Sequence, residues 1–385
     1  MTRLRTGLGM TLACLLTLAC SFAHAEEWAS VANFGSYAEL DDNPRLLSEA
    51  AEAVQGVVAD VSVQLTRRTE SSTLGFQPRV VARRYTGDYA LDSDDVFFNA
   101  DYAVNAERSQ YSLGARYSRD GTLTSEFIST GFVGANVPRE IHGLRGSASR
   151  NVSERTTLYG SLDYQDVGYV GGSRYGLVDY QYWSGVAYAQ RSLNERTSFN
   201  VITRLALLDV PLTGAESREV SVGLGLDRQW SDRWKSTFAL GPTFSESNGR
   251  SNGTNTSYRA NLNGTWPRSA LGVEAVRLLT PDAGQGTLET RDRASVSARH
   301  RLTEYLSANA FAAVDYYSDP DTPRNQGGGY RSFVSAGGGL AWQAAPEWSL
   351  SIRYEHSRRE EFTTASGSQL LAGFSWRGLQ RTISR

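Results

Sequence analysis

The chain contains very little sulfur. Its 385 residues include two cysteines and two methionines, and all four lie within the first 25 residues. If this segment is removed on export, the mature chain has no thiol, so it can form neither a disulfide nor a thiolate-bound metal site. The absence of Cys14 and Cys20 from the mature chain therefore excludes disulfide-stapled and thiolate-metal proteins.

The first 25 residues have the features of a secretory signal peptide. Two arginines give a charged start, the run from Met10 to Ala19 is apolar, and Ala23-His24-Ala25 is a small-x-small cleavage site. A lipoprotein signal ending before Cys20 is the alternative, but Thr17 occupies the position where such signals usually have leucine. We predict a cleaved signal peptide over residues 1–25.

Long apolar runs and a strong net charge are also missing. Beyond residue 25 no stretch approaches the roughly 18 apolar residues that a membrane helix requires, and the mean hydropathy is −0.39. Removing Arg3 and Arg5 from 39 basic residues leaves 37 against 41 acidic ones, a charge of −4 that disfavours nucleic-acid binding. Low hydropathy is still compatible with a β-barrel, because only every second residue of a spanning strand must face lipid.

The chain instead shows a repeated alternation of apolar and polar side chains. In residues 348–356 one face carries Trp348, Leu350 and Ile352, and the other carries serine, arginine and glutamate. A soluble sandwich also alternates, but the apolar faces here are rich in alanine, leucine, valine and tyrosine and end in aromatic residues, which favours a membrane barrel. The same pattern recurs in residues 96–104, 158–164, 220–226 and 305–316.

Two kinds of connection alternate along the chain. Eight short turns lie near Thr69, Glu107, Ser153, Asn194, Asp232, Arg268, Thr303 and Pro346. Nine longer loops, rich in aspartate, asparagine, glycine and proline, cover about 41–52, 87–94, 119–140, 169–177, 209–217, 246–255, 281–286, 318–329 and 359–367. These 17 connections predict an all-β fold, a transmembrane antiparallel β-barrel of about 18 strands (16–20 with a different first strand or a hairpin in 119–140), with short periplasmic turns and long extracellular loops.

Aromatic residues mark both ends of the predicted barrel. Tyrosines beside the long loops are Tyr85, Tyr164, Tyr169, Tyr175, Tyr316, Tyr317 and Tyr330. Tryptophans beside the short turns or a chain end are Trp28, Trp230, Trp234, Trp266, Trp342, Trp348 and Trp376, and only Trp183 lies inside a strand. Because these rings prefer the membrane–water interface, we predict two aromatic girdles around one barrel domain over residues 26–385, in a Gram-negative outer membrane.

A short N-terminal motif adds a family resemblance. Residues 37–46 read Tyr-Ala-Glu-Leu-Asp-Asp-Asn-Pro-Arg-Leu and follow a signal peptide and a first strand. This resembles the start of β-barrel porins associated with exopolysaccharide operons and exosortase systems, in which an Asp-Asn pair in an early turn precedes the barrel. The resemblance implies an outer-membrane accessory of polysaccharide export. The chain departs from the usual aromatic C-terminus by ending in residues 379–385, so Phe374 and Trp376 are the candidates for an insertion signal.

Candidate catalytic groups are few. The mature chain has only His142, His300 and His356, and each shares a predicted face with apolar residues, so none suits a general base. We therefore predict no enzyme, no cofactor and no metal site. The acidic residues 92–95 and 315–321 could bind calcium or bridge to lipopolysaccharide through divalent ions, although a solvated loop is the simpler interpretation.

The polar face of the predicted barrel is rich in charge. Arg291, Arg293, Arg299 and Arg301 alternate along one strand and predict a basic strip on the inner wall. Other inward positions carry acidic residues. A basic and an acidic wall that face each other would create a transverse field that orients polar solutes. The alternative interpretation is that these charges pair locally. The other charged candidates for the lumen are Arg353, Asp101, Asp163, Asp227, Glu274, Asp315 and Glu355. Inward positions suited to sugar hydroxyls are Asn99, Asn200, Asn261, Asn263, Gln165, Tyr159 and Phe311.

One long loop carries an apolar load. Phe127, Ile128, Phe132 and Val133 lie within the otherwise polar residues 119–140, and a freely solvated loop would not carry them. We predict that this segment folds into the mouth of the barrel and narrows it.

These features favour a non-enzymatic pore for small hydrophilic solutes or an anionic glycan, or an accessory of exopolysaccharide export. The alternative is a surface or assembly component whose loops bind polysaccharide or partner proteins while the lumen is closed. The expected partners are outer-membrane lipid and lipopolysaccharide, and also exopolysaccharide or secretion proteins, but no nucleic acid.

Overall fold

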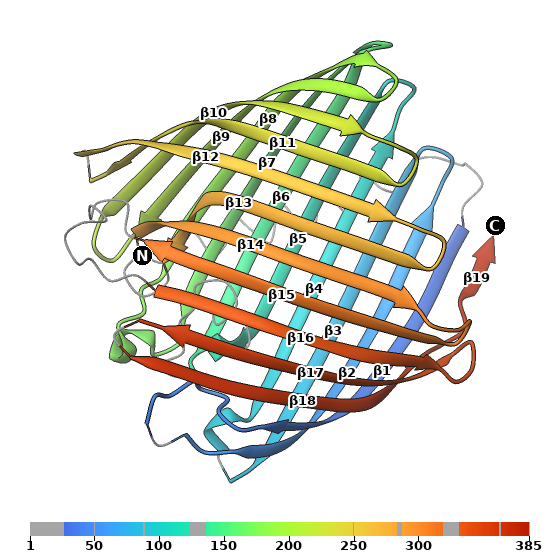
Figure 1. Cartoon of the computed structure of the whole chain (residues 1–385), viewed down its shortest axis with the longest axis vertical. Helices are drawn as coiled ribbons and strands as arrows, with labels where there is room; N and C mark the ends of the chain where they lie inside the picture. The colour runs from blue at the N-terminus through green and yellow to red at the C-terminus, as the bar shows by residue number, and fades with distance from the viewer. Residues whose placement is uncertain are drawn as a thin grey trace.

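The computed structural model describes residues 27–49, 51–87, 89–123, 136–248, 250–282, 287–318, 331–361 and 363–384, which form a closed antiparallel β-barrel (Figure 1). Its strands are β1 (Glu27–Asp41), β2 (Val54–Arg68), β3 (Ser72–Thr86), β4 (Ser93–Asn105), β5 (Ser109–Gly121), β6 (Pro138–Ser153), β7 (Thr156–Tyr169), β8 (Tyr180–Asn194), β9 (Thr197–Val210), β10 (Ala215–Gln229), β11 (Trp234–Ser247), β12 (Arg250–Thr265), β13 (Ser269–Asp282), β14 (Thr287–Arg301), β15 (Leu306–Ser318), β16 (Arg331–Gln343), β17 (Trp348–Glu360), β18 (Thr364–Arg377) and the short β19 (Arg381–Ser384). Two single-turn helices, η2 (Tyr89–Leu91) and η3 (Gly172–Tyr175), lie in loops.

The wall closes because β1 pairs with strands from both ends of the chain. Tyr37 lies opposite Val58 of β2 on one side and opposite Gly373 of β18 on the other. All other long strands pair with their neighbours in chain order. The barrel therefore has 18 long strands, as the alternation and the turns predicted.

Alternation along each strand separates an outer apolar face from an inner polar face. In β17, Leu350, Ile352 and Tyr354 are exposed on the outside, whereas Ser351 and Arg353 line an internal pocket. This pattern suits a wall between lipid and water, because successive side chains of a strand point to opposite faces. No helix in the described ranges is long and apolar enough to cross a membrane.

The tryptophan girdle is present at the short-turn end, but the tyrosine girdle is only partial. Trp28, Trp342 and Trp348 are exposed on the outer face near the short turns. Among the predicted tyrosines, Tyr169 and Tyr317 are buried inside the barrel and Tyr85 lines the pocket. The prediction was wrong for these three because each occupies an inward position of its strand. Tyr330 lies outside the described residues.

Several predicted long loops are largely strand. β9 and β10 are separated by only residues 211–214, and β17 and β18 by only residues 361–363. β11 continues to Ser247 and β12 begins at Arg250, so most of the expected loop over 246–255 is paired. Polar residues on both faces of a strand look like a loop in the sequence, yet the ladder bonds continue wherever the neighbouring strand is also extended.

The last residues of the described chain complete the wall. β18 pairs with β1 up to Arg377 opposite Asn33, and β19 resumes with Arg381 opposite Ser30. Three residues, 378–380, therefore lie opposite two residues of β1, which is a one-residue β-bulge. The basic tail is thus a continuation of the last strand along the edge of β1.

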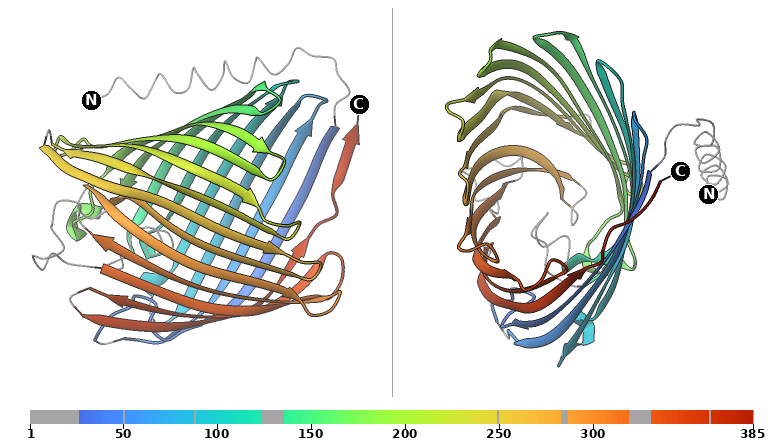
Figure 2. Two further views of the ribbon diagram at one scale, coloured as in Figure 1. Left: turned by 45° about the horizontal axis from the view of Figure 1, so that its top comes forward. Right: turned by 90° about the vertical axis from the view of Figure 1, so that its right-hand side faces the viewer.

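One interruption of the wall lies between β12 and β13. Their ladder stops at the pair Tyr258 and Arg277, although β12 begins eight residues earlier at Arg250 and β13 continues to Asp282. Beyond this point β13 pairs only with β14, and the end-on view in Figure 2 shows the ends of these two strands curving into the barrel. In agreement, β14 contacts β10, which is four strands away in the order of the wall.

Candidate functional site

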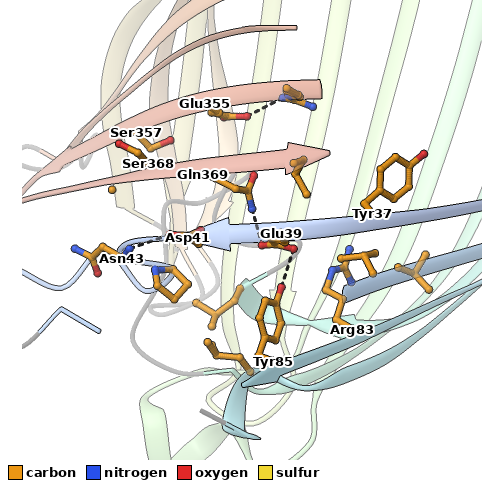
Figure 3. A pocket seen from close by; sticks show the side chains of 18 of the residues that line it. Tyr37, Glu39, Asp41, Asn43, Arg83, Tyr85, Glu355, Ser357, Ser368 and Gln369 are labelled. Carbon is orange, nitrogen blue, oxygen red and sulfur yellow. Dashed lines mark hydrogen bonds and ion pairs between the residues drawn. The ribbon is translucent and has the colours of Figure 1, made fainter. Parts of the chain in front are cut away.

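The main cavity of the described barrel lies inside the wall, towards the end with the longer loops. It has a volume of about 570 Å³ and is formed by β1–β3, β17 and β18, with the loop after β1 across it (Figure 3). Its polar lining residues are Tyr37, Glu39, Asp41, Asn43, Asp60, Arg79, Arg83, Tyr85, Asn136, Ser351, Arg353, Glu355, Ser357, Ser368 and Gln369. Several of these belong to the N-terminal motif at residues 37–46, so the motif is part of the lumen.

The motif continues β1 into an inward fold that is fixed by hydrogen bonds. Asp42 forms two hydrogen bonds with the backbone of Ser368: its amide donates to the Ser368 carbonyl at 3.1 Å, and its side-chain carboxylate accepts from the Ser368 amide at 2.6 Å. The Asn43 side chain donates to the carbonyls of Leu47 at 2.8 Å and Ser366 at 2.9 Å, and it accepts from the Leu47 amide at 2.9 Å. Asn43 therefore ties the loop both to itself and to β18.

Leu46 is the apolar end of this fold. It is only 2% exposed and packs with Tyr317, Phe333 and Ala365, which come from β15, β16 and β18. Gly367 allows the close approach, because a Cβ there would lie 2.9 Å from the Asn43 carbonyl oxygen. Residues 42–49, named here the β1 plug, thus lie against the inner wall. The chain does turn here, with the Asp41 carboxylate accepting from the Asn43 amide at 2.9 Å, but no local pattern reveals the long-range partners of the loop.

Hydrogen-bonding groups of both charges surround the cavity. Glu39 accepts from the Tyr85 hydroxyl at 3.1 Å and from the Gln369 amide at 2.7 Å, as Figure 3 shows. Arg79 forms two bonds to Asp60 at 2.9 and 2.7 Å. Carboxylates, amides and hydroxyls at fixed positions are the groups that recognise polyhydroxylated molecules, so this lining suits a sugar more than an apolar ligand.

The predicted lumen residues Arg353 and Glu355 belong to the same cavity. Arg353 bonds to Glu355 at 2.7 Å, and its guanidinium lies 5.2 Å from the centre of the Phe311 ring. The planar group therefore stacks beside an aromatic ring that was itself predicted to face inward. A ring next to a charged group provides both stacking and hydrogen bonding for a saccharide.

The structure divides the predicted arginine strip of β14 into two halves. Arg291 and Arg293 both pair with Asp315 of β15, at 2.7 and 3.3 Å, and this carboxylate is only 2% exposed. Arg299 and Arg301, nearer the short turn, are exposed and form no ion pair within the described residues. The local pairing that was the alternative interpretation applies to the first half only.

Three further acidic candidates, Asp101, Asp163 and Asp227, have partners on other strands of the wall. Asp101 pairs with Arg145 at 3.5 Å, and Asp163 pairs with Arg116 at 3.7 Å. Asp227 accepts from the Asn200 side chain at 2.9 Å. These contacts run along the wall, so the acidic residues do not form a separate wall opposite the basic strip.

The sequence reasoning missed most of the inward arginines. Arg79, Arg83, Arg116, Arg139 and Arg145 all face inward and pair with carboxylates, Arg83 with Asp95 and Arg139 with Asp120 among them. Continuing the two-residue alternation through β3, β5 and β6 would have identified them. It would equally have identified Arg204 and Arg259, which line a small second pocket on β9–β12 and form no ion pair in the described part of the chain.

The predicted constriction residues Phe127, Ile128, Phe132 and Val133 lie outside the described residues. The flanks of their segment are well packed: Thr122 and Val137 are buried, and their backbones are joined by a 3.0 Å hydrogen bond. Leu123 and Asn136 line the main cavity.

The histidines are placed as the alternation predicted. His300 and His356 occupy outward positions of their strands, and each contacts a serine hydroxyl, Ser269 at 2.7 Å and Ser368 at 3.0 Å. The structure shows no metal-binding group of His, Cys, Asp or Glu among the residues it describes.

The acidic stretch 92–95 is occupied by internal contacts. Asp92 accepts from the Tyr85 amide at 2.8 Å, Asp94 pairs with Arg84 at 2.7 Å, and Asp95 pairs with Arg83. These carboxylates are therefore engaged by neighbouring groups of the protein, which weighs against the divalent-ion interpretation for this loop. Of the second stretch, Asp315 is paired and residues 319–321 lie outside the described ranges.

Comparison with known proteins shows the fold. No family model and no curated protein matches the chain. OpdO of Pseudomonas aeruginosa is similar with a TM-score of 0.51 at 12% identity, over 92% of this chain and 98% of that one. OccK2 (OpdF) of Pseudomonas aeruginosa in complex with glucuronate gives 0.47 at 12%, over 92% and 98%. A bacterial polysaccharide outer membrane secretin gives 0.38 at 10%, over 93% and 100%.

Proposed function

We propose that this chain is an outer-membrane channel for small hydrophilic solutes or an anionic glycan, with its short turns in the periplasm and its longer loops at the cell surface. The proposal is supported by the 18-stranded closed barrel, a size that encloses an aqueous channel unless it is plugged. It is also supported by the apolar outer face and the tryptophan girdle. In this proposal the protein is not an enzyme and needs no cofactor.

The observation that carries the proposal is the unpaired end of the arginine strip. Arg299 lies between Ala270 of β13 and Asn309 of β15, and Arg301 lies opposite Ser307, so their cross-strand neighbours are uncharged. The acidic residue Glu274 on β13 is opposite Ser295, four residues further along the strand. Two exposed guanidinium groups on the inner wall, without a carboxylate beside them, attract anions from the aqueous lumen.

Ion selectivity in a planar bilayer tests this function. The variant R299Q/R301Q keeps polar bulk and removes two charges, so the folded barrel should lose part of its anion preference at 0.1 M salt. The loss should shrink at 1 M, because the Debye length falls from about 10 Å to about 3 Å. The matched control is R228Q, which removes an exposed charge from the outer face near the same end and should leave selectivity unchanged. Equal anion preference in wild type and double variant at 0.1 M would overturn the proposal.

The filled loop end favours a second candidate, a surface or assembly component with a closed lumen. The β1 plug and a second apolar cluster around Val210 and Leu208 occupy the inner wall there. A folded protein that remains silent in the bilayer, yet binds acidic polysaccharide when displayed on cells, would favour this candidate over the channel.

The finer assignment to exopolysaccharide export rests on the motif at residues 37–46. Its side chains Tyr37, Glu39, Asp41 and Asn43 line the main cavity, whose polar groups suit a saccharide. Cells that carry the variant E39Q/D41N, with normal barrel abundance, should secrete less polysaccharide than wild type. The matched control E246Q, on the outer face of β11, should secrete normally, and an equal loss in both variants would contradict the assignment.

A further inference from the structure

The ends of β13 and β14 are not part of the wall. We name residues 278–281 and 288–290 the β13–β14 tip. Leu279 and Leu288 occupy outward positions in the strand alternation, yet they are only 7% and 2% exposed and pack with Val210 of β9. Because Val210 faces inward, the outer surface of the tip must lie against the inner surface of the opposite strands. The tip has therefore folded through the mouth and into the lumen.

This position leaves a strand edge without a partner. Residues 250–257 of β12 pair with β11 on one side, but β13 has left the other side. Residues 278–282 of β13 likewise pair only with β14. Unpaired edges of this length normally find a partner, so the wall retains a vacant place for the tip.

The surface beneath the tip also fits it poorly. Ser217, Glu219 and Ser221 of β10 and Thr243 and Ser245 of β11 face inward and are buried, although all are polar. Buried atoms without a hydrogen-bond partner in the described part occur on both sides of this contact, at Thr243 and Arg259 on the wall and at Thr290 on the tip. Each such group costs free energy until water or another partner reaches it.

A second position of the tip would give the unpaired strand edges a partner and would expose the buried polar groups to water. Continuing the register beyond Tyr258 and Arg277 places Ser257 opposite Leu278 and Thr256 opposite Leu279. In that position Leu279 and Leu288 would face outward and extend the apolar belt, and the polar residues of β10 and β11 would meet water. The apolar cluster around Val210 favours the inward position, so each position has its own stabilising contacts.

We propose that the β13–β14 tip is a gate with two positions: folded inward it fills the lumen and leaves a side opening between β12 and β13, and paired with β12 it clears the lumen and seals the wall. Asp292 holds the hinge, because it bonds to Arg277 at 2.7 Å and accepts from the Tyr258 hydroxyl at 3.0 Å on the outer face. The proposal rests on the channel function for its consequence, but the movement itself can be measured separately.

A disulfide tests the movement directly. In the inward position, the variant T256C/L279C has its two thiols on opposite sides of the wall, where no disulfide can form. In the outward position, the two cysteines are cross-strand neighbours, and a disulfide can form. The mature chain has no other cysteine, so the bond is unambiguous. With a mild oxidant we expect the crosslink to form in the folded barrel and the conductance to rise severalfold, both reversed by a reductant.

Two controls separate the possible results. L262C/V273C joins two residues that are already paired between β12 and β13, so its crosslink should leave the conductance unchanged. The single variant L279C measures the effect of losing the leucine side chain. If the control pair crosslinks and T256C/L279C does not, the tip does not reach β12 and the proposal is overturned. If T256C/L279C crosslinks without any change in an otherwise conducting barrel, the tip does not gate the lumen. A crosslink in a protein that never conducts would establish the movement and overturn the channel function instead.

Discussion

The two ends of the barrel differ although the same strands form both. At the loop end, inward positions carry buried apolar residues such as Val167, Leu208 and Phe333, and the β1 plug and the β13–β14 tip pack against them. At the short-turn end, inward residues such as Arg299 and Arg301 are exposed. The difference teaches that the wall fixes the diameter of the barrel, whereas segments that fold inward at one end decide how much of it is open.

Removing the β1 plug should have the largest effect on this difference. If residues 44–48 are replaced by two glycines, the cluster of Tyr317, Phe333 and Ala365 loses Leu46, and the cavity opens at the loop end of the barrel. We expect the single-channel conductance to rise severalfold, because the plug is no longer in the conducting path. The control replaces residues 211–213 in the same way, since Leu212 is 78% exposed and fills nothing. No rise in the plug variant would place the narrowest point elsewhere.

Weakening the attachment of the plug should have the next largest effect. N43A removes three hydrogen bonds, each worth about 0.5–1.5 kcal/mol net, so the fraction of time in the open state should increase roughly tenfold or more. N43D keeps the acceptor for the Leu47 amide and loses only the two donated bonds. It should lie between wild type and N43A in single-channel recordings. An N43D variant as open as N43A would show that the acceptor contributes nothing.

Crowding the plug should have a smaller effect. In G367A the new Cβ would lie 2.9 Å from the Asn43 carbonyl oxygen and 3.0 Å from Leu46, so the plug must shift by a few tenths of an ångström. We expect a modest increase in open time and a small decrease in thermal stability. G160A is the control, because its nearest neighbour would be 4.0 Å away. Similar behaviour of the two variants would mean that the plug tolerates the shift.

Relieving the poor fit beneath the β13–β14 tip should have the smallest effect, in the opposite direction. T243V/T290V removes two buried hydroxyls that have no partner in the described part of the chain. The inward position should become more stable, and the channel should open less often, by less than about a factor of ten. More frequent opening would show that these hydroxyls support the inward position.

Much of the fold follows from the sequence because alternation and turn spacing are local. All eight short turns lie where they were predicted, and the outward residues of β15 and β17 are those that the pattern assigned. The inward segments could not be predicted in this way. Leu46 is buried by residues about 270 to 320 positions away, and nothing near it in the sequence indicates these partners.

The charged site was predicted in kind but not in pairing. The two-residue alternation alone places Arg291 and Arg293 inward, but only the register between β14 and β15 brings Asp315 opposite Arg293 and within reach of Arg291. A shift of that register would have left both arginines unpaired, as Arg299 and Arg301 are. Whether an inward charge is free or neutralised is therefore a property of neighbouring strands, which a single segment does not contain.

The seam between β1 and the last strands has a consequence for the order of folding. β1 is joined on one side to β2, which follows directly, and on the other to residues 369–384, more than 300 positions later. Until those residues are present, the edge of β1 that later pairs with β18 and β19 is unpaired, and it can pair with any extended chain. Contacts of such sequence separation form slowly. The wall therefore stays open until the last strands of the chain pair with β1.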